Sequence, residues 1–147
     1  MEFYKMIDAN TFSNLVITES MDTTLSPIPA GEHPAYIKDQ KLRQQKEYWI
    51  LDITWVATDQ ASIDATQRDE PTVRQSIFLD FTPEGALDTG KGKNIQLGKL
   101  REAVNQNQKG KSWSPGMLVG ASAIINITHE VYKENLQANV KGVAKAL

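Results

Sequence analysis

Alternating apolar and polar positions predict β-strands through the middle of the chain. The clearest run is YWILDITWVA at residues 48–57, in which every second residue from Trp49 to Trp55 is apolar and large. TVRQSIFLDF at residues 72–81 alternates in the same way, and HPAYIKDQKL at residues 33–42 does so over a shorter stretch. We expect these three segments to form strands with one buried face.

The second half of the chain predicts one helix and two more strands. In NIQLGKLREAVNQN, residues 94–107, apolar residues recur at helical spacing behind Asn94, a residue type that favours the N-cap. MLVGASAIINITHEV, residues 117–131, is rich in β-branched residues, and we expect a long strand that bends at Gly120. LQANVKGVAKAL, residues 136–147, is the last predicted strand.

Polar and turn-rich segments separate these elements. TDQASIDATQRDEP, residues 58–71, is acidic and ends in proline, so we expect a long loop. Residues 1–30 contain few regular patterns and predict an N-terminal arm, with residues 12–18 as a short edge strand or part of that arm. Residues 31–147 then form the folded domain.

The order strand, strand, strand, helix, strand, strand predicts a mainly β fold. A five-stranded Greek-key OB-fold barrel, with one helix between strands 3 and 4, has this order and is a frequent platform for single-stranded nucleic acids and sugars. A β-sandwich with one connecting helix would give a similar order, so this alternative stays open.

Composition narrows the class of protein. A chain of 147 residues with 40% hydrophobic and 23% charged residues is typical of one soluble domain, and no apolar run approaches the roughly 18 residues of a membrane helix. The absence of cysteine excludes disulfides and cysteine-based zinc sites, and two histidines make a histidine-built metal centre a poor hypothesis. The opening MEFYKMIDAN lacks the pattern of a secretion signal, and we expect a cytoplasmic protein.

Charge is distributed unevenly along the chain. Residues 1–90 carry 7 Lys and Arg against 15 Asp and Glu, a net charge of −8, whereas residues 91–147 carry 9 against 3, a net charge of +6. Such asymmetry favours one surface that attracts an anion while another stays acidic. Chance clustering of solvated charges explains the same numbers equally well.

GALDTGKGKN, residues 85–94, nearly matches a phosphate-binding loop of nucleotide hydrolases. The position that requires Ser or Thr for magnesium is Gly92, and the chain has too few helices for the parallel sheet in which such loops occur. We therefore expect no ATP site. Two glycines still allow close approach of a ligand, and Lys91 and Lys93 can neutralise phosphates.

Other catalytic patterns are weak. Asp52 and Asp80 could face one another on neighbouring strands and bind a metal, but pairing with Arg74 or with solvent is the better hypothesis. His129 has no second histidine at a metal-binding spacing, and no nucleophile elbow is present. We expect a protein that is not an enzyme and that needs no cofactor or metal.

Aromatic residues interleaved with basic ones indicate a different chemistry. Bases stack on aromatic faces while Lys and Arg follow the phosphates, which is how proteins bind single strands without sequence preference. Trp49 and Trp55 are expected in the core, and packing is an equally good explanation for Tyr48, Phe78 and Trp113. The candidate DNA-binding residues are Tyr36, Lys38, Tyr48, Arg74, Phe78, Lys91, Lys93, Lys109, Lys111, Trp113 and Lys141.

Three segments of the chain resemble small phage-encoded proteins from replication gene clusters. They are PIPAGEHPAYIKD before and within the first strand, GKGKNIQLGKLREAVNQN after the third, and LVGASAIINITHEVYKEN in the fourth. Members of that family are regarded as OB-fold single-stranded-DNA-binding proteins. The resemblance implies protection of single-stranded DNA during phage replication or recombination, with a binding surface on the face of strands 2 and 3 and the adjoining loops.

Partners follow from the same hypothesis. Single-stranded DNA comes first, with further copies of the chain and replication or recombination proteins as the protein partners to consider. The rival hypothesis is a β-rich interaction module, a virion component or an inhibitor of a host protein, that assembles through its sheet surface and the segment at residues 12–18. In that case the lysines serve only solubility.

Overall fold

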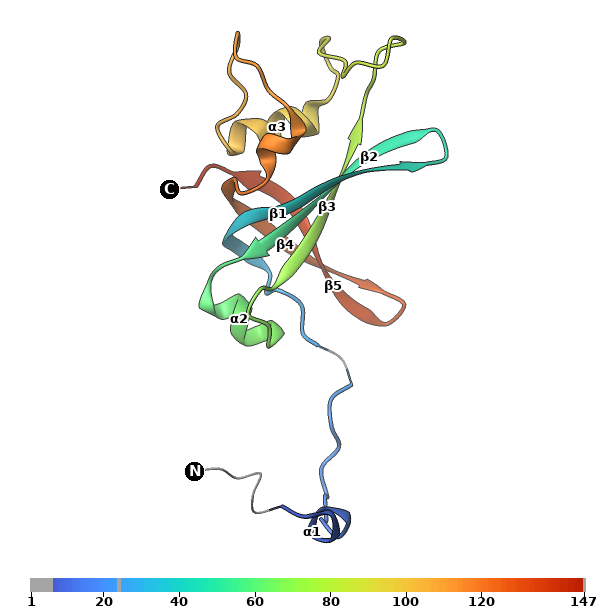
Figure 1. Cartoon of the computed structure of the whole chain (residues 1–147), viewed down its shortest axis with the longest axis vertical. Helices are drawn as coiled ribbons and strands as arrows, with labels where there is room; N and C mark the ends of the chain where they lie inside the picture. Colours follow the sequence, from blue (N-terminus) through green and yellow to red (C-terminus); the bar gives the residue numbers. More distant parts are fainter. Residues whose placement is uncertain (1–6, 24, 147) are drawn as a thin grey trace.

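The computed structural model describes residues 7–23 and 25–146 and contains one five-stranded antiparallel sheet (Figure 1). Residues 1–6 and 24 of the predicted arm and residue 147 of the predicted domain lie outside the described part. The strands are β1 (Gly31–Gln45), β2 (Tyr48–Ala57), β3 (Thr72–Leu79), β4 (Ser122–Tyr132) and β5 (Asn135–Ala144). The helical segments are α1 (Ala9–Ser13), α2 (Gln60–Thr66), α3 (Ile95–Ala103) and the 3-10 turn η2 (Pro115–Leu118).

The strand order across the sheet is β3-β2-β1-β4-β5. The predictions of a mainly β fold and of a helix, α3, between the third and fourth strands are confirmed. The edge strands β3 and β5 approach each other, but among the described residues no ladder of hydrogen bonds joins them. The sheet is therefore open on this side, and the predicted Greek-key OB-fold barrel is not confirmed.

Strand β1 is shared by both halves of the sheet. Its second half pairs with β2, from Ala35 opposite Ala57 to Gln45 opposite Tyr48, while its first half pairs with β4. The register with β2 shifts at Lys38, which is a β-bulge. A bulge bends its strand and increases the local twist, so β1 can serve both partners while the sheet curves over one core.

The core lies on the concave side of the sheet and is covered at one end by α3 and η2. The predicted inward residues Leu51 and Ile53 of β2 and Val73 and Ile77 of β3 are buried, and Leu79 is partly buried. Trp55 is fully enclosed, and its Nε1 donates a hydrogen bond to Gln75 Oε1 at 2.9 Å. Trp49 was expected beside it but is 37% exposed. Trp49 pairs with Leu79 at the end of the sheet, and its ring meets that of Phe81 edge-on at 6.2 Å between centroids.

Helix α2 occupies the segment that was predicted as a loop. Its buried side chains are Ser62 and Thr66, one turn apart, and Thr66 Oγ1 donates to the Ser62 carbonyl at 2.8 Å. A helix whose buried face is built from small polar residues leaves no hydrophobic periodicity in the sequence. The pattern therefore could not reveal it.

Two other expected strand segments differ. Residues 9–13 form α1 in place of the predicted edge strand, because Asp8 caps the helix by accepting a hydrogen bond from the Thr11 amide at 2.7 Å. Residues 115–118 form η2 ahead of a turn at Gly120, whose φ of 89° is in the left-handed region that favours glycine. Strand β4 consequently begins only at Ser122.

The base of the arm is fixed to the domain by two histidines. His33 binds the Pro29 carbonyl through Nε2 at 2.6 Å and Asp59 through Nδ1 at 2.9 Å, and His129 Nε2 lies 2.7 Å from the Ile28 carbonyl. Ile28 itself is buried in the core. On the N-terminal side of Ile28 the described chain extends away from the domain, and α1 lies well away from the sheet (Figure 1). None of the described helices has the length and apolar character needed to cross a membrane.

Candidate nucleic-acid interface

An aromatic pair lies on the outer face of the sheet. Tyr48 and Phe78 come from the neighbouring strands β2 and β3, and their rings meet edge to face with centroids 5.7 Å apart. Both are about half exposed, at 52% and 55%. Beneath them the buried Ile50 forms the floor of a shallow hollow of about 470 Å³, with Lys46 at its rim. The hollow therefore offers flat aromatic surface next to a positive charge.

A buried carboxylate organises the cations on this face. Asp52 accepts hydrogen bonds from Arg43 Nε at 2.7 Å, from Arg43 Nη2 at 3.2 Å and from Ser76 Oγ at 2.8 Å. Arg74 Nη1 lies 4.0 Å away, and its side chain is 65% exposed. The hydrogen bonds from Arg43 lower the pKa of Asp52 most, and that from Ser76 adds to the effect. Asp52 thus remains a carboxylate that holds Arg43 in place.

Asp52 and Asp80 have different partners. The predicted pairing of Asp52 with Arg74 is present at 4.0 Å, but Arg43, which the sequence did not suggest, lies closer at 2.7 Å. Asp80 receives the Asn94 amide on its carboxylate at 2.9 Å and so closes the loop that follows β3. In the part of the chain that the structure describes, no group of three or more potential ligands is suited to a metal ion.

Tyr36 and Lys38 lie at the other end of the outer face and share one partner. Tyr36 Oη donates to Glu70 at 3.0 Å, and Lys38 Nζ donates to the other oxygen of Glu70 at 3.2 Å. Hydrogen bonding to Glu70 is the main reason why the pKa of the Tyr36 phenol is raised. At about 3.3 Å per residue, the outer face from Tyr48 to Val56, which pairs with Tyr36, spans roughly 26 Å.

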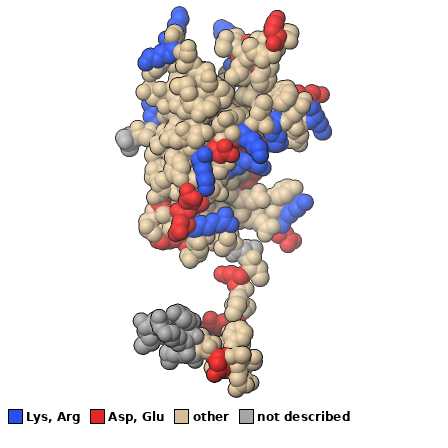
Figure 2. Space-filling view, viewed as in Figure 1, with Lys and Arg blue, Asp and Glu red and all other residues tan. Residues whose placement is uncertain are grey.

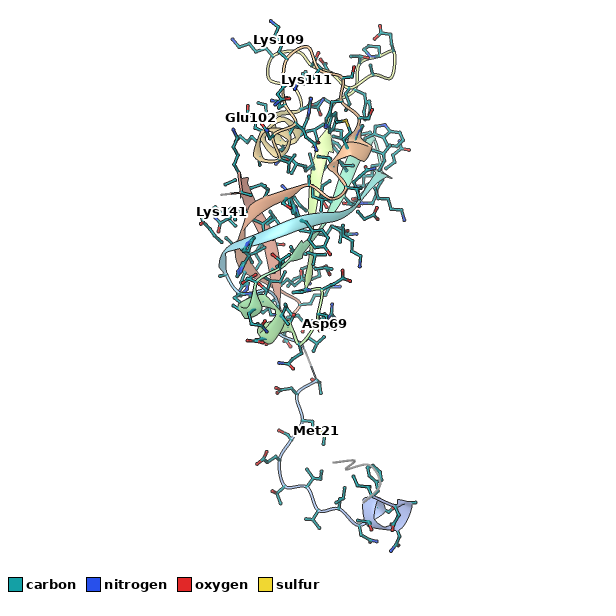
Figure 3. All side chains as sticks on the ribbon, turned by 60° about the vertical axis from the view of Figure 1, so that its left-hand side comes forward. Met21, Asp69, Glu102, Lys109, Lys111 and Lys141 are labelled. Atoms are coloured by element: carbon teal, nitrogen blue, oxygen red, sulfur yellow. The ribbon has the colours of Figure 1, made fainter. Side chains whose placement is uncertain are left out.

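A second candidate surface is a groove at the loop end of the domain, which we call the loop groove. It measures about 520 Å³ and lies between the loop at residues 85–94, α3 and the loop at residues 105–114. The predicted residues Lys93, Lys111 and Trp113 line it together. Figure 3 shows Lys109 and Lys111 at this end of the molecule and Lys141 lower down, away from them.

Trp113 is partly buried against the core, so packing accounts for part of its ring surface. Its Nε1 donates to Gln106 Oε1 at 2.9 Å, and the Arg101 guanidinium stacks over the ring at 4.2 Å from the centroid. Such a cation–π contact stabilises both groups and covers one face of the ring. Base stacking on Trp113 is therefore limited to whatever ring surface Arg101 leaves uncovered.

The loop before α3 is held by Asn94. Its Nδ2 donates to the carbonyls of Asp80 and Asp88, at 2.8 and 2.9 Å, and its Oδ1 accepts from the Asp80 amide at 2.8 Å. The side chain does not cap α3 as expected, because it is committed to these bonds and the backbone has a φ of 51°. Lys91 and Lys93 remain exposed on the loop, which follows an antiparallel strand rather than a parallel one.

Sequence reasoning missed Arg43, Lys46 and Arg101. Arg43 faces Ile50 and reaches Asp52 only through the β1–β2 register, which one strand's pattern does not contain. Arg101 was recoverable, because it follows the buried Leu97 by one helical turn and so lies on the same side of α3. The candidate residues thus fall on two surfaces, the outer sheet face and the loop groove, with Lys141 on β5 apart from both.

No protein-family model matches this chain, and no curated protein matches it in sequence. The resemblance to phage single-stranded-DNA-binding proteins therefore stays a prediction from the sequence. Any function must be argued from the two surfaces themselves.

Proposed function

We propose that this protein is a sequence-tolerant, non-enzymatic binder of single-stranded DNA that uses its outer sheet face. The observation that carries the proposal is the half-exposed Tyr48–Phe78 pair above the hollow, with cations beside it. Large aromatic side chains that lie together on the surface commonly mark a binding site. A base that stacks on such a pair gains about 1–3 kcal/mol without any requirement for sequence.

The arrangement of strands supports the proposal. Three consecutive strands, a helix and a returning hairpin in the order β3-β2-β1-β4-β5 have the connectivity of a partly open OB-fold, which we propose as the fold type. OB-folds bind oligonucleotides on the face of strands 2 and 3. Tyr48, Phe78 and Arg74 belong to β2 and β3 of this chain.

The DNA strand would run from the aromatic hollow toward Tyr36 and Lys38, with its phosphates near Arg43 and Arg74. Exposed cations beyond the end of β3 can extend this path: Lys91, Lys93, Lys109 and Lys111. The sequence resemblance suggests a role in phage replication or recombination in the host cytoplasm. Protein partners from those processes belong to the same proposal.

Fluorescence anisotropy with labelled oligo-dT at two salt concentrations tests the proposal. Phe78→Ala should weaken binding by about 1–3 kcal/mol, because one stacking surface is lost. Tyr132→Ala is the matched control, since Tyr132 is similarly exposed at 58% and also has a lysine near its ring, but lies at the end of β4. Wild-type affinity should fall steeply with salt. Equal losses in both variants, or an affinity that ignores salt, would contradict the proposal.

An interaction module remains the second candidate, and the exposed apolar side chains of the arm favour it. The same titration separates the two, because such a module needs no affinity for oligo-dT even at low salt. Binding by the arm and binding of DNA can also coexist, since the arm and the outer sheet face are separate surfaces (Figure 1).

A further inference from the structure

The described part of the arm is unusually apolar for an exposed segment, and its only charges are negative. Residues 7–30 contain Asp8, Glu19 and Asp22 but no Lys or Arg, and the charged side chains that Figure 2 shows on this segment are acidic. Apolar side chains this dense and this exposed mark an interaction segment. Those that are at least half exposed are Ile7, Phe12, Leu15, Val16, Ile17, Met21 and Leu25.

The loop groove has the complementary character. Its lining includes three cations, Lys93, Arg101 and Lys111, and one carboxylate, Asp88. Among the described residues, no ion pair engages these three cations. Between them lies apolar surface from Leu87, Ile95 and Trp113, and Ile95 is 55% exposed. A groove of 520 Å³ is within the range, roughly 300–1,000 Å³, of pockets that bury small ligands.

Arg101 is the most buried of the three cations that line the loop groove. Its guanidinium stacks on the Trp113 ring, its Nε donates to the Gln106 carbonyl at 3.0 Å, and partial burial lowers the pKa of the guanidinium. Among the described residues no carboxylate pairs with it, so a partly buried charge of this kind gains from an anion brought into the same groove. The groove thus combines cationic and apolar surface.

The arm and the loop groove lie at opposite ends of the molecule (Figures 1 and 3). The base of the arm is anchored by Ile28 and by His33 and His129, so the arm starts away from its own groove. We propose that the arm of one copy docks in the loop groove of a second copy, head to tail. Phe12 and Leu15 would cover the apolar floor, and the arm carboxylates would face Lys93, Lys111 and Arg101.

Such a contact joins two different surfaces, so it repeats from copy to copy and gives an open row unless the rotation between copies closes a ring. Copies would form open rows, which is the arrangement that covers a continuous strand cooperatively. The outer sheet face stays accessible in each copy because neither contact surface includes Tyr48 or Phe78. In an assembled copy, Lys93 and Lys111 contact the arm in place of the DNA phosphates that they could otherwise reach. The proposal does not depend on DNA binding, since assembly is measured on the protein alone.

Sedimentation velocity across a range of protein concentrations tests the proposal with a charge exchange. One variant, Glu19→Lys with Asp22→Lys, reverses the arm and leaves the Asp8 cap intact. The other, Lys93→Glu with Lys111→Glu, reverses the loop groove. The control, Lys99→Glu with Lys141→Glu, makes the same change at exposed residues that do not line the groove. Circular dichroism confirms that each variant is folded.

We expect the average mass of the wild type and of the control to rise with concentration and to fall again at high salt. Each reversed variant alone should associate more than about tenfold more weakly, because like charges then meet. An equimolar mixture of the two reversed variants should regain assembly, since each arm then finds a groove of opposite charge. A wild type that stays monomeric throughout, whether its arm folds back or awaits another protein, overturns the proposal. So does a mixture that fails to assemble.

Discussion

Asp52 sets a balance between stability and affinity on the outer sheet face. Its carboxylate neutralises Arg43, which pairs in register with Ile50 beneath the aromatic hollow, and so reduces the positive charge that a phosphate would meet. Asp52→Asn keeps the shape of the side chain and removes the charge. We expect this variant to bind single-stranded DNA more tightly and to unfold more easily.

The magnitude follows from the hydrogen bonds of Asp52. The carboxylate accepts two bonds from Arg43 and one from Ser76, and its side chain is only 9% exposed. Hydrogen bonds to charged groups contribute about 1.5–3 kcal/mol each when both partners are buried. Because the Arg43 side chain is 36% exposed and regains water, the loss of stability should be about 1–2 kcal/mol in total.

The pH dependence has a definite sign. The pKa of Asp52 is lower in the folded protein than its ordinary value of 3.8, chiefly because Arg43 donates hydrogen bonds to it. Such a group stabilises the fold above the unfolded pKa and loses that contribution as the pH falls through the folded pKa. The difference in unfolding free energy between wild type and Asp52→Asn should therefore be constant near neutral pH and shrink in acid below about pH 4.

Urea unfolding and oligo-dT titration measure the two effects. Without the Asp52 charge, Arg43 becomes free to contact a phosphate. The slope of log affinity against log salt should then steepen by about 0.7, the value for one added phosphate contact on a single strand. Asp64→Asn is the charge control, because Asp64 is exposed on α2 and bonds only to residues of its own segment. If Asp52→Asn destabilises the fold while affinity and slope stay unchanged, Arg43 does not contact DNA.

Two further predictions concern other parts of the chain. Replacing both Lys91 and Lys93 by Ala should flatten the same salt slope by about 1.4, and an unchanged slope would remove that loop from the DNA path. Trp55→Ala should cost about 3–5 kcal/mol in urea unfolding because the ring is fully enclosed, whereas Trp49→Ala should cost clearly less because this side chain is 37% exposed. Equal losses for the two tryptophans would contradict this reading of the core.

Most of the sheet could be predicted from the sequence, whereas the short helical segments α1, α2 and η2 could not. Strand positions follow from alternation, since a strand with one face on the core must repeat every two residues. The same rule misplaced Trp49, because periodicity assigns a face but does not say where along the strand the core ends. It also missed α2, whose buried Ser62 and Thr66 are held by hydrogen bonds rather than by hydrophobic burial.

The candidate sites depended more on long-range partners. Residue type and turn context suggested Tyr48, Phe78 and the loop lysines, and the structure places the first two side by side. Pairings across the fold, such as Arg43 with Asp52 or Tyr36 with Glu70, required the strand register and the path of a loop. A local pattern carries neither. For this reason Arg43 was absent from the predicted set, and the pairing of Lys38 with Glu70 was not foreseen.

The pairing of β1 with both β2 and β4 also bears on how the chain folds. Strands β1, β2 and β3 are joined through residues 46–47 and 58–71, whereas β1 pairs with β4 only when Gly31 meets Ile127 across most of the chain. Contacts between distant residues close large loops and therefore form slowly. The three-stranded meander that carries Tyr48 and Phe78 can thus assemble while the hairpin of β4 and β5 is still absent. Until that hairpin docks, the apolar inner side of β1 stays uncovered, and in this interval the nascent chain is most exposed to aggregation.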